Sequence, residues 1–509
     1  MKKCTFIMSL VLGFGLACAE DGPDVIHPGK ILSPLGTTSL KTAEISAYMP
    51  SYHKLFVVGG EPMMEVVSLD DPAKPKALGA MKLLGKASSV TTFDDFVAVS
   101  EIMDPEQDPG FVEIFRIVED IPVKVGSYKV CAQPDMLTYT PDGKNILVAC
   151  EGSPNKDFSV DPPGEIAILT PGRLNAKDSL IVKTKIIGFN KLDSNALMKQ
   201  GVRKVGPNSF FQSLEPEYIT VSEDSKTAWV SLQENNAMAK INIPLKKVEK
   251  IFPLGTVDHS QPGNGLDPRK NGAIMIENVP VHGLRQPDGI CAFNVNGKPY
   301  VVTANEGAAM DDYEGWSDVT TTLNLFEHGR LEETAFDGKA LGALQTLMVS
   351  NVEYCDAMRG KCPYVHSFGT RGISIFDGTS GELVWDSGEK IEKMLAKTAP
   401  QYFNRNAKKN KVKMDARSDN KGCEPENVTV GVSGEDRYAF VGLERMSGIV
   451  VFNISDLEKP KIVDYYLDLK DNGPEGILFI SAENSPIPGQ ALLVVGYEYS
   501  KTLTIYKVN

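Results

Sequence analysis

The chain has 509 residues and a formal net charge of −13, with 53 Lys and Arg residues against 66 Asp and Glu residues. This balance argues against nucleic acid as a partner, because neutralising phosphates requires a basic surface. A hydrophobic content of 42% together with 45 Gly and 32 Pro excludes a disordered chain and predicts a folded protein rich in turns.

The N-terminus has the pattern of a secretory signal peptide. Lys2 and Lys3 precede a short apolar run, and Ala17-Cys18-Ala19 matches a small-residue cleavage site. We expect cleavage after Ala19, with lipoprotein processing at Cys18 as the alternative. No hydrophobic tail follows the last strand, so we expect a secreted protein without a membrane span, periplasmic if the source is bacterial.

One pattern recurs through the rest of the chain: a Pro beside an acidic residue, a strand, a turn and a second strand that ends near Glu. Three weaker copies end at Glu61, Glu101 and Arg371. Short alternating strands in repeated units of three or four predict an all-β fold, the β-propeller. We count eight blades, with seven as the alternative if the unit at Arg371 is an insertion. The clear copies begin at QPDML (133–137), EPEYI (215–219), QPDGI (286–290), EPENV (424–428) and GPEGI (473–477).

Residues 20–509 are therefore expected to form a single propeller domain. The last unit stops after its third strand, so we predict that the segment 31–40 supplies the missing outer strand and closes the ring. The segments 191–204 and 389–404 have helical periodicity and are predicted to be surface insertions.

The cysteines and the glycosylation sequons fit an exported protein. Removal of Cys4 and Cys18 with the signal peptide leaves six of the eight Cys. Spacing favours the pairs Cys131–Cys150 and Cys355–Cys362; Cys291 and Cys423 would then pair by elimination, with free thiols as the alternative. Asn427 and Asn453 begin N-x-S/T sequons, which matter only in a eukaryotic source, and Asn453 is the more accessible candidate.

Several blocks of the sequence resemble a known family. LEPEYITVSEDSKTAWVSLQENNA (214–237), VTANEG (302–307), LERMSGIVVF (443–452) and GPEGILFISAENSP (473–486) are similar to the choice-of-anchor I family. Within it, the resemblance is to the mesenchyme-specific cell-surface glycoproteins of biomineralising animals, and it runs from about residue 43 to 506. It implies a secreted or surface β-propeller. It leaves the activity open, since bacterial members are labelled atypical alkaline phosphatases and animal members matrix proteins.

The repeated acids are the main candidates for chemistry. In a propeller blade the first strand starts on the face where the second strand ends, so the two sets of acids should gather on one face. Such a face suits a hard cation, calcium or another divalent ion, and no organic cofactor is expected. The alternative is structural, with the acids capping backbone N–H groups between blades. The first set is Glu44, Asp135, Glu217, Asp288, Glu426 and Glu475, and the second is Glu61, Glu101, Glu151, Glu234, Glu306, Glu444 and Glu498.

Ten of these acids are the predicted metal ligands: Asp135, Glu151, Glu217, Glu234, Asp288, Glu306, Glu426, Glu444, Glu475 and Glu498. The leading hypothesis is a non-enzymatic, acidic propeller that binds cations, extracellular matrix or a mineral surface and is related to biomineralisation. The alternative is a metal-dependent phosphoesterase that would bind phosphate through Arg371, His282 and His366. The sequence shows no zinc-type His spacing, nucleophile elbow or P-loop in its support.

Overall fold

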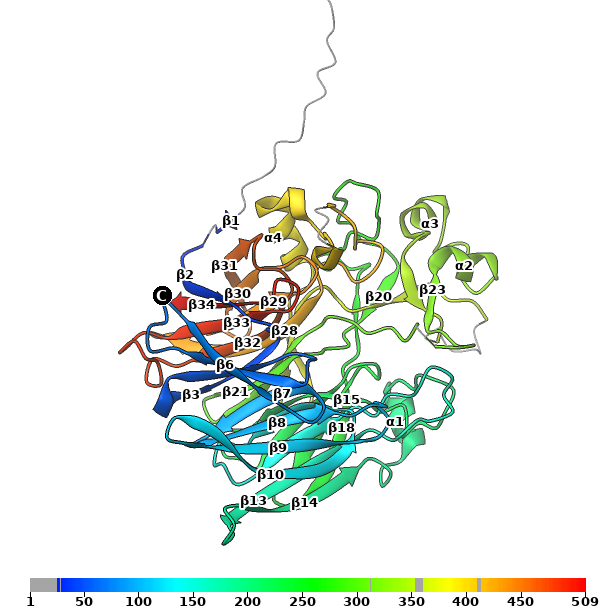
Figure 1. Ribbon diagram of the computed structural model, residues 1–509. Coiled ribbons are helices and arrows are strands. Elements are labelled where there is room, and N and C mark those ends of the chain that lie inside the picture. Colours follow the sequence, from blue (N-terminus) through cyan, green and yellow to red (C-terminus); the bar gives the residue numbers. More distant parts are fainter. Residues whose placement is uncertain (1–24, 28, 312, 353–359, 410–412) are drawn as a thin grey trace, which may run out of the picture.

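The computed structural model describes residues 25–27, 29–311, 313–352, 360–409 and 413–509. The predicted signal peptide and Cys18 lie outside the described residues. Strands dominate the described chain, and short helices lie at its periphery (Figure 1).

Seven antiparallel units of four strands form the blades of a β-propeller within the described chain, which confirms the predicted fold class. Each innermost strand contacts the innermost strands of both neighbouring blades, and the last contacts the first, so the ring closes. From blade 1 to blade 7 the innermost strands are β3 (Ile45–Met49), β7 (Lys86–Phe93), β11 (Pro134–Tyr139), β15 (Pro216–Val221), β21 (Ile290–Val295), β28 (Pro425–Ser433) and β32 (Pro474–Ile480).

The other strands follow outward in each blade. The second strands are β4 (Lys54–Val58), β8 (Phe96–Ile102), β12 (Ile146–Cys150), β16 (Thr227–Leu232), β22 (Lys298–Ala304), β29 (Asp436–Leu443) and β33 (Leu492–Tyr497). The third strands are β5 (Met63–Ser68), β9 (Pro109–Val118), β13 (Glu165–Leu174), β17 (Ala237–Asn242), β26 (Ile373–Asp377), β30 (Ile449–Asn453) and β34 (Thr502–Val508). The outer strands are β6 (Lys76–Lys82), β10 (Ile121–Ala132), β14 (Leu180–Gly188), β18 (Lys247–Pro253), β27 (Leu383–Asp386), β31 (Lys461–Asp468) and β2 (Leu32–Ser39), and β1 (Val25–Ile26) pairs outside β31.

The last blade takes its outer strand from the N-terminal part of the chain. β2 pairs antiparallel with β34, from Leu32 opposite Val508 to Ser39 opposite Thr502. Leu32 is fully buried against Tyr506 and its neighbours in the core of that blade. The prediction that the segment 31–40 closes the ring is confirmed.

The blade count of eight is wrong, and the alternative of seven is right. The strand before Arg371, β25 (Val365–Phe368), pairs in parallel with β20 (Val281–Leu284) in a separate five-stranded sheet. Two segments of the chain form this sheet: its first two strands in the chain lie between blades 4 and 5, and the other three, including β25, lie between the second and third strands of blade 5, β22 and β26, which pair with each other. A degenerate repeat and an inserted strand look alike in sequence. The inserted sheet also contains β19 (Thr256–Asp258), β23 (Val319–Thr321) and β24 (Met348–Ser350).

Short helices occur in the inserted segments. α1 (Ser194–Gln200) lies within 191–204 and is capped by Asp193, whose side chain accepts hydrogen bonds from the first-turn amides. α4 (Lys390–Thr398) lies within 389–404. The inserted sheet carries α2 (Thr322–Glu327) and α3 (Gly338–Leu344), beside β23 in Figure 1. The 3₁₀ turns are η1 (Pro50–Tyr52), η2 (Pro400–Tyr402) and η3 (Ala407–Lys409).

The core lies between adjacent blades, which explains the unbroken apolar runs of the second strands. In β4, Phe56 and Val58 pack toward blade 2, whereas Leu55 and Val57 pack toward blade 7. Both faces of the strand are buried, so the sequence from Leu55 to Val58 is apolar at successive positions instead of alternating.

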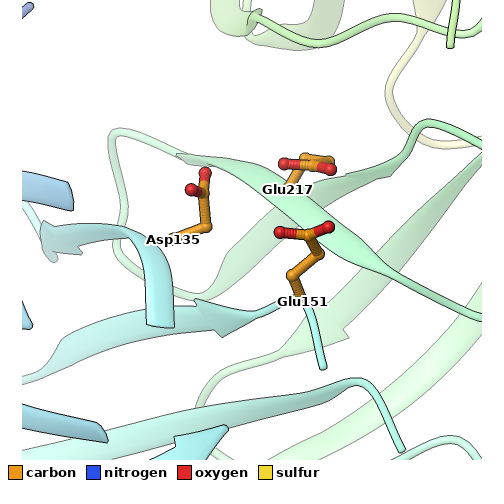
Figure 2. A group of neighbouring side chains, drawn as sticks. All are labelled: Asp135, Glu151 and Glu217. Atoms are coloured by element: carbon orange, nitrogen blue, oxygen red, sulfur yellow. The ribbon is translucent and has the colours of Figure 1, made fainter. Parts of the chain in front are cut away.

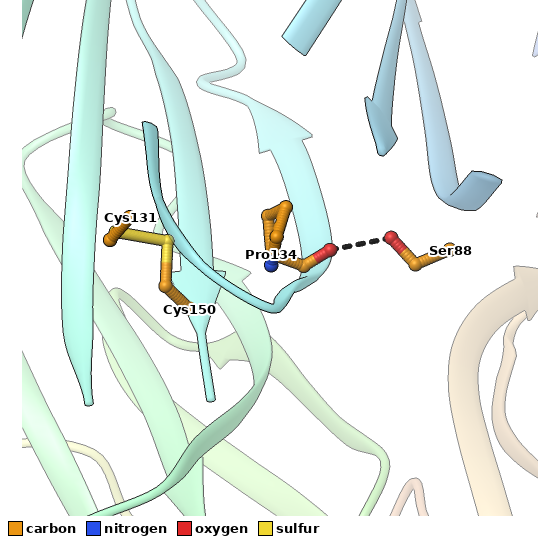
Figure 3. The surroundings of a disulfide bond; sticks show 4 residues. All are labelled: Ser88, Cys131, Pro134 and Cys150. Atoms are coloured by element: carbon orange, nitrogen blue, oxygen red, sulfur yellow. Dashed lines mark hydrogen bonds between the residues drawn. A yellow bond between two sulfur atoms is a disulfide. The ribbon is translucent and has the colours of Figure 1, made fainter. Parts of the chain in front are cut away.

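One disulfide joins two blades. Cys131, at the end of β10 in blade 2, is bonded to Cys150, at the end of β12 in blade 3 (Figure 3). The pairing of Cys291 with Cys423 is wrong. Both are free thiols: Cys291 lies in the innermost strand β21, and Cys423 is buried where its thiol donates to the carbonyl of Arg371. Cys355 lies outside the described residues, so its pairing stays a prediction.

Candidate functional site

The acids of the first set line a single cavity at the mouth of the central channel. Four of the six acids, Asp135, Glu217, Glu426 and Glu475, directly follow a proline at which the strand register shifts, so each of these four lies in a β-bulge. Bulges re-aim side chains, and these turn the carboxylates into the channel. The cavity has a volume of about 280 Å³. Its acidic lining residues are Glu44, Asp135, Glu217, Asp288, Glu426 and Glu475.

Blade 2 contributes a hydroxyl instead of an acid. Ser88 lies in the register shift of β7, as Asp135 does in β11, and it lines the same cavity. Its Oγ donates a hydrogen bond to the carbonyl oxygen of Pro134 over 2.5 Å (Figure 3). The channel mouth is therefore a ring of six carboxylates and one serine.

A carboxylate of the second set meets two of the first set between blades 3 and 4. Oxygens of Asp135, Glu151 and Glu217 all lie within 4.8 Å of one another (Figure 2). The side chains that donate hydrogen bonds to Glu151 are the amide of Gln133 and the hydroxyl of Ser153, both neutral. Three acids thus converge on one point, and within the described structure the side chains that donate to Glu151 bring no positive charge to it.

The protonation behaviour of this group reflects that lack of counter-charge. Burial raises the pKa of Asp135 to about 6, with Glu217 as its hydrogen-bonding neighbour. Burial, followed by repulsion from Asp135 and other acids, raises the pKa values of Glu151 and Glu217 well above their ordinary range. Such a group holds a proton or a cation more readily than it stays fully ionised.

A related group lies between blades 5 and 6. Oxygens of Asp288, Glu306 and Glu426 lie within 4.8 Å of one another. Burial, and then repulsion from Glu306, raises the pKa values of both Asp288 and Glu426. Glu426, only 7% exposed, and Asn427, 4% exposed, each carry a buried side-chain oxygen without a hydrogen-bond partner in the described structure, and both residues line the cavity.

A third group of acids is neutralised by basic side chains. It shares Glu306 with the second group and adds Glu424 and Glu444. Burial favours a raised pKa for Glu424, but its basic neighbours bring that pKa below the ordinary value. This group is an ion-pair network with basic side chains, and not the set of caps on backbone N–H groups that the structural alternative predicted. The basic partners of Glu424 are Arg417, Lys421 and Arg445, at 2.5, 3.2 and 3.4 Å.

The remaining repeated acids include the predicted ligands Glu234, Glu475 and Glu498, and also Glu44 and Glu101, which were not predicted as ligands. Burial, then repulsion from Glu498, raises the pKa of Glu44 to about 7. Burial also raises the pKa of Glu234 to about 7 and that of Glu475 well above its usual range. Glu101 is fully buried, and its carboxylate accepts a hydrogen bond from the amide of Gly85 over 2.7 Å, which is a bracing role.

The predicted phosphate site is wrong. The guanidinium of Arg371 is buried and donates to Glu392 over 2.7 Å and to the carbonyls of Asp267, Ser418 and Asn420, so its donors are committed to the protein. His282 and His366 lie opposite each other on β20 and β25 of the inserted sheet, not among the acids that line the channel mouth.

The two sequons differ in accessibility. Asn427 is 4% exposed at the channel wall, so its assignment as a glycosylation site is wrong for the folded protein. Asn453 ends β30 and is half-buried, and its glycosylation stays a prediction.

Sequence reasoning missed Lys421 and Glu424. Lys421 donates to Glu306 and, over 2.8 Å, to the carbonyl of Gly307. For Glu424 a signal was present in the sequence: a Gln or Glu precedes the repeat proline in four of the five clear copies. Gln133 and Glu424 both adopt a positive φ, and each side chain lies beside the acid that follows the second strand of its own blade.

The described chain contains no helix that is long and apolar enough to cross a membrane. Among solved structures, the Cps50 (Swd1) β-propeller domain of Myceliophteria thermophila is similar at 7% identity, with a TM-score of 0.47 and coverage of 94% of this chain and all of that one.

Two curated proteins are similar in sequence. The Mesenchyme-specific cell surface glycoprotein of Strongylocentrotus purpuratus is 29% identical over 280 residues, which are 49% of this chain and 36% of that protein. Gigasin-3a of Magallana gigas is 29% identical over 164 residues, 28% of this chain and 57% of that protein. The chain thus matches less than two thirds of either relative. The family model of the choice-of-anchor I domain matches residues 44–457, and the protein therefore belongs to the choice-of-anchor I family.

Proposed function

We propose that the protein is an extracellular, non-enzymatic propeller that binds a divalent hard cation, calcium, between blades 3 and 4. The observation that carries this proposal is the convergence of Asp135, Glu151 and Glu217 within 4.8 Å, where the hydrogen-bond donors to Glu151 are neutral. Calcium takes six to eight oxygen ligands, of which three carboxylates supply several and water in the adjoining cavity supplies others.

The size and charge of the channel mouth support a cation over an organic ligand. The lining of the cavity of about 280 Å³ includes six carboxylates and one basic side chain, Lys86, so its excess of acidic groups repels anions and concentrates cations at its mouth. A divalent ion would replace the protons that the raised pKa values indicate, and would relieve the repulsion between blades.

The extracellular location and the biological setting are also part of the proposal. The curated relatives include one named as a cell surface glycoprotein, and the Cys131–Cys150 disulfide fits an oxidising compartment. In such a compartment an acidic ring that holds calcium could bridge the protein to extracellular matrix or to a mineral surface. We propose that this bridging is the function of the protein and that it takes place during biomineralisation.

Calorimetric titration of the metal-stripped protein with calcium chloride tests the site. We expect saturable binding with a dissociation constant on the order of 10⁻⁴ to 10⁻³ M, as in other extracellular calcium modules. Glu151→Gln should weaken it. Glu249→Gln makes the same chemical change at an exposed pair with Lys240 and should leave it unchanged. Absence of both heat and a rise in melting temperature at millimolar calcium would overturn the proposal.

A further inference from the structure

The two carboxylate groups of the ring are related by the repeat. Asp135 and Asp288 come from the start of blades 3 and 5, and Glu217 and Glu426 are the corresponding acids of the next blades. Glu151 and Glu306 follow the second strands of blades 3 and 5. In each group the same three positions therefore bring their carboxylates within 4.8 Å.

The groups differ in what contacts the acid that follows the second strand. Glu151 receives hydrogen bonds from Gln133 and Ser153. Glu306 receives one from Gln233 over 2.8 Å and an ion pair from Lys421. A primary ammonium group thus contacts Glu306 in the second site, whereas in the described part of the chain the side chains that donate to Glu151 in the first site are neutral.

Resting on the proposed function, we propose that Lys421 is a built-in counter-ion. Its ammonium occupies at Glu306 the place that a divalent cation takes at Glu151. Calcium binding in the ring is therefore confined to the site of Asp135, Glu151 and Glu217, and removal of the Lys421 charge opens a second site at Asp288, Glu306 and Glu426.

The local structure fixes this ammonium in place. Lys421 is held in a tight turn, since the amides of Asn420 and Gly422 both donate to the carbonyl of Arg417 over 3.0 Å. Its Nζ also lies 3.2 Å from Glu424, and 15% of the side chain is exposed. Burial alone would lower the pKa of Lys421, but Glu306 and Glu424 more than offset this and keep the ammonium protonated.

The second site keeps an oxygen available for a ligand. Glu426 Oε2 is buried at the cavity wall and has no hydrogen-bond partner within the described residues, and Asn427 Oδ1 beside it is in the same state. Glu426 belongs to the same group of three carboxylates as Glu306, the acid that Lys421 neutralises. Without the ammonium, the group has three carboxylates at the same repeat positions as the first site, and Asn427 Oδ1 at the cavity wall is one further oxygen.

Calcium titration of Lys421→Gln, with Lys421→Arg as the control that keeps the charge, tests the inference. We expect one additional equivalent of calcium in Lys421→Gln, none in Lys421→Arg, and loss of the added equivalent in Lys421→Gln combined with Glu426→Gln. Calcium should also raise the melting temperature of Lys421→Gln more than that of the wild type. If Lys421 had only a structural role, calcium would raise both melting temperatures by the same amount. An unchanged stoichiometry in a folded Lys421→Gln overturns the inference.

The reciprocal variant keeps the inference testable if Lys421→Gln does not fold. Gln133→Lys places an ammonium beside Glu151, as Lys421 is placed beside Glu306, and should lower calcium affinity at the first site by at least about tenfold. Unchanged affinity in Gln133→Lys contradicts the counter-ion role. If the wild type binds no calcium, the proposed function fails. If the wild type binds it and neither variant changes binding, only the inference fails.

Discussion

The carboxylates of Asp135 and Glu217 meet across the boundary between two blades, although the residues belong to different repeats. Each comes from a bulge at the start of an innermost strand, so the contact depends on how blades 3 and 4 are packed. A cation held by both acids would bridge the two blades directly. Calcium binding should therefore stabilise the packing of the ring and not only occupy its mouth.

Replacing either partner of this contact should weaken calcium binding. We expect Asp135→Asn and Glu217→Gln each to raise the dissociation constant for calcium by about tenfold or more, because affinity at such sites depends on the number of charged ligands. Without calcium, both variants should be at least as stable as the wild type, since each removes a repelling charge. Paired titration and thermal melting check this, and a variant that binds calcium as the wild type does would contradict the assigned ligands.

The acids of the ring should make the folded protein less stable as the pH rises, which is opposite to the effect of ordinary surface acids. The pKa values of Glu44 and Glu234 are raised to about 7 and that of Asp135 to about 6, in each case mainly by burial. Between the ordinary pKa near 4 and these values, the folded state holds protons that the unfolded chain has lost. The ring's contribution to the free energy of unfolding therefore falls as the pH rises from about 4 to about 7.

Calcium should compete with these protons. Asp135 has a pKa of about 6, so at pH 5 its carboxyl group holds a proton that calcium must displace. This competition should weaken the apparent calcium affinity by about tenfold at pH 5 relative to pH 8. The calcium-induced rise in melting temperature should therefore be larger at pH 8 than at pH 5. Melting curves with calcium and with chelator at both pH values isolate the ring from the other titrating groups, and an equal rise at both would contradict the assignment.

The repeat made much of the fold predictable. Pro and acid pairs such as Pro134 and Asp135 mark where the innermost strand begins in five of the seven blades, so the convergence of these acids could be predicted from the sequence. The blade count could not, because the strand before Arg371 has the pattern of a blade strand and only its parallel pairing with β20 places it in an insertion. Lys421 was unpredictable for a similar reason, since its partner Glu306 is brought to it by tertiary packing.

Arg371 should matter for stability and not for catalysis. It pairs with Glu392 over 2.7 Å, and both side chains are at least 95% buried. We expect Arg371→Met to cost about 3–5 kcal/mol in the free energy of unfolding, because it leaves an uncompensated buried carboxylate. Arg116→Gln, which breaks an exposed pair with Asp95, should leave the free energy of unfolding close to that of the wild type. Urea unfolding measures both, and a cost for Arg371→Met as small as the control's would refute the buried-pair role.

The disulfide should hold blades 2 and 3 together near the cation site. Cys131 and Cys150 are separated by 19 residues and lie close to the start of β11, which carries Asp135. A closed loop of this length contributes about 3 kcal/mol by restricting the unfolded chain. We expect Cys131→Ser combined with Cys150→Ser to lower the free energy of urea unfolding by about this amount, whereas Cys291→Ser, at a free thiol, should not reproduce the loss. Calcium titration of the double variant distinguishes two roles of the disulfide. If the variant is less stable but binds calcium as the wild type does, the bond acts only by restricting the unfolded chain. If the variant also binds calcium more weakly, the bond positions Asp135 as well.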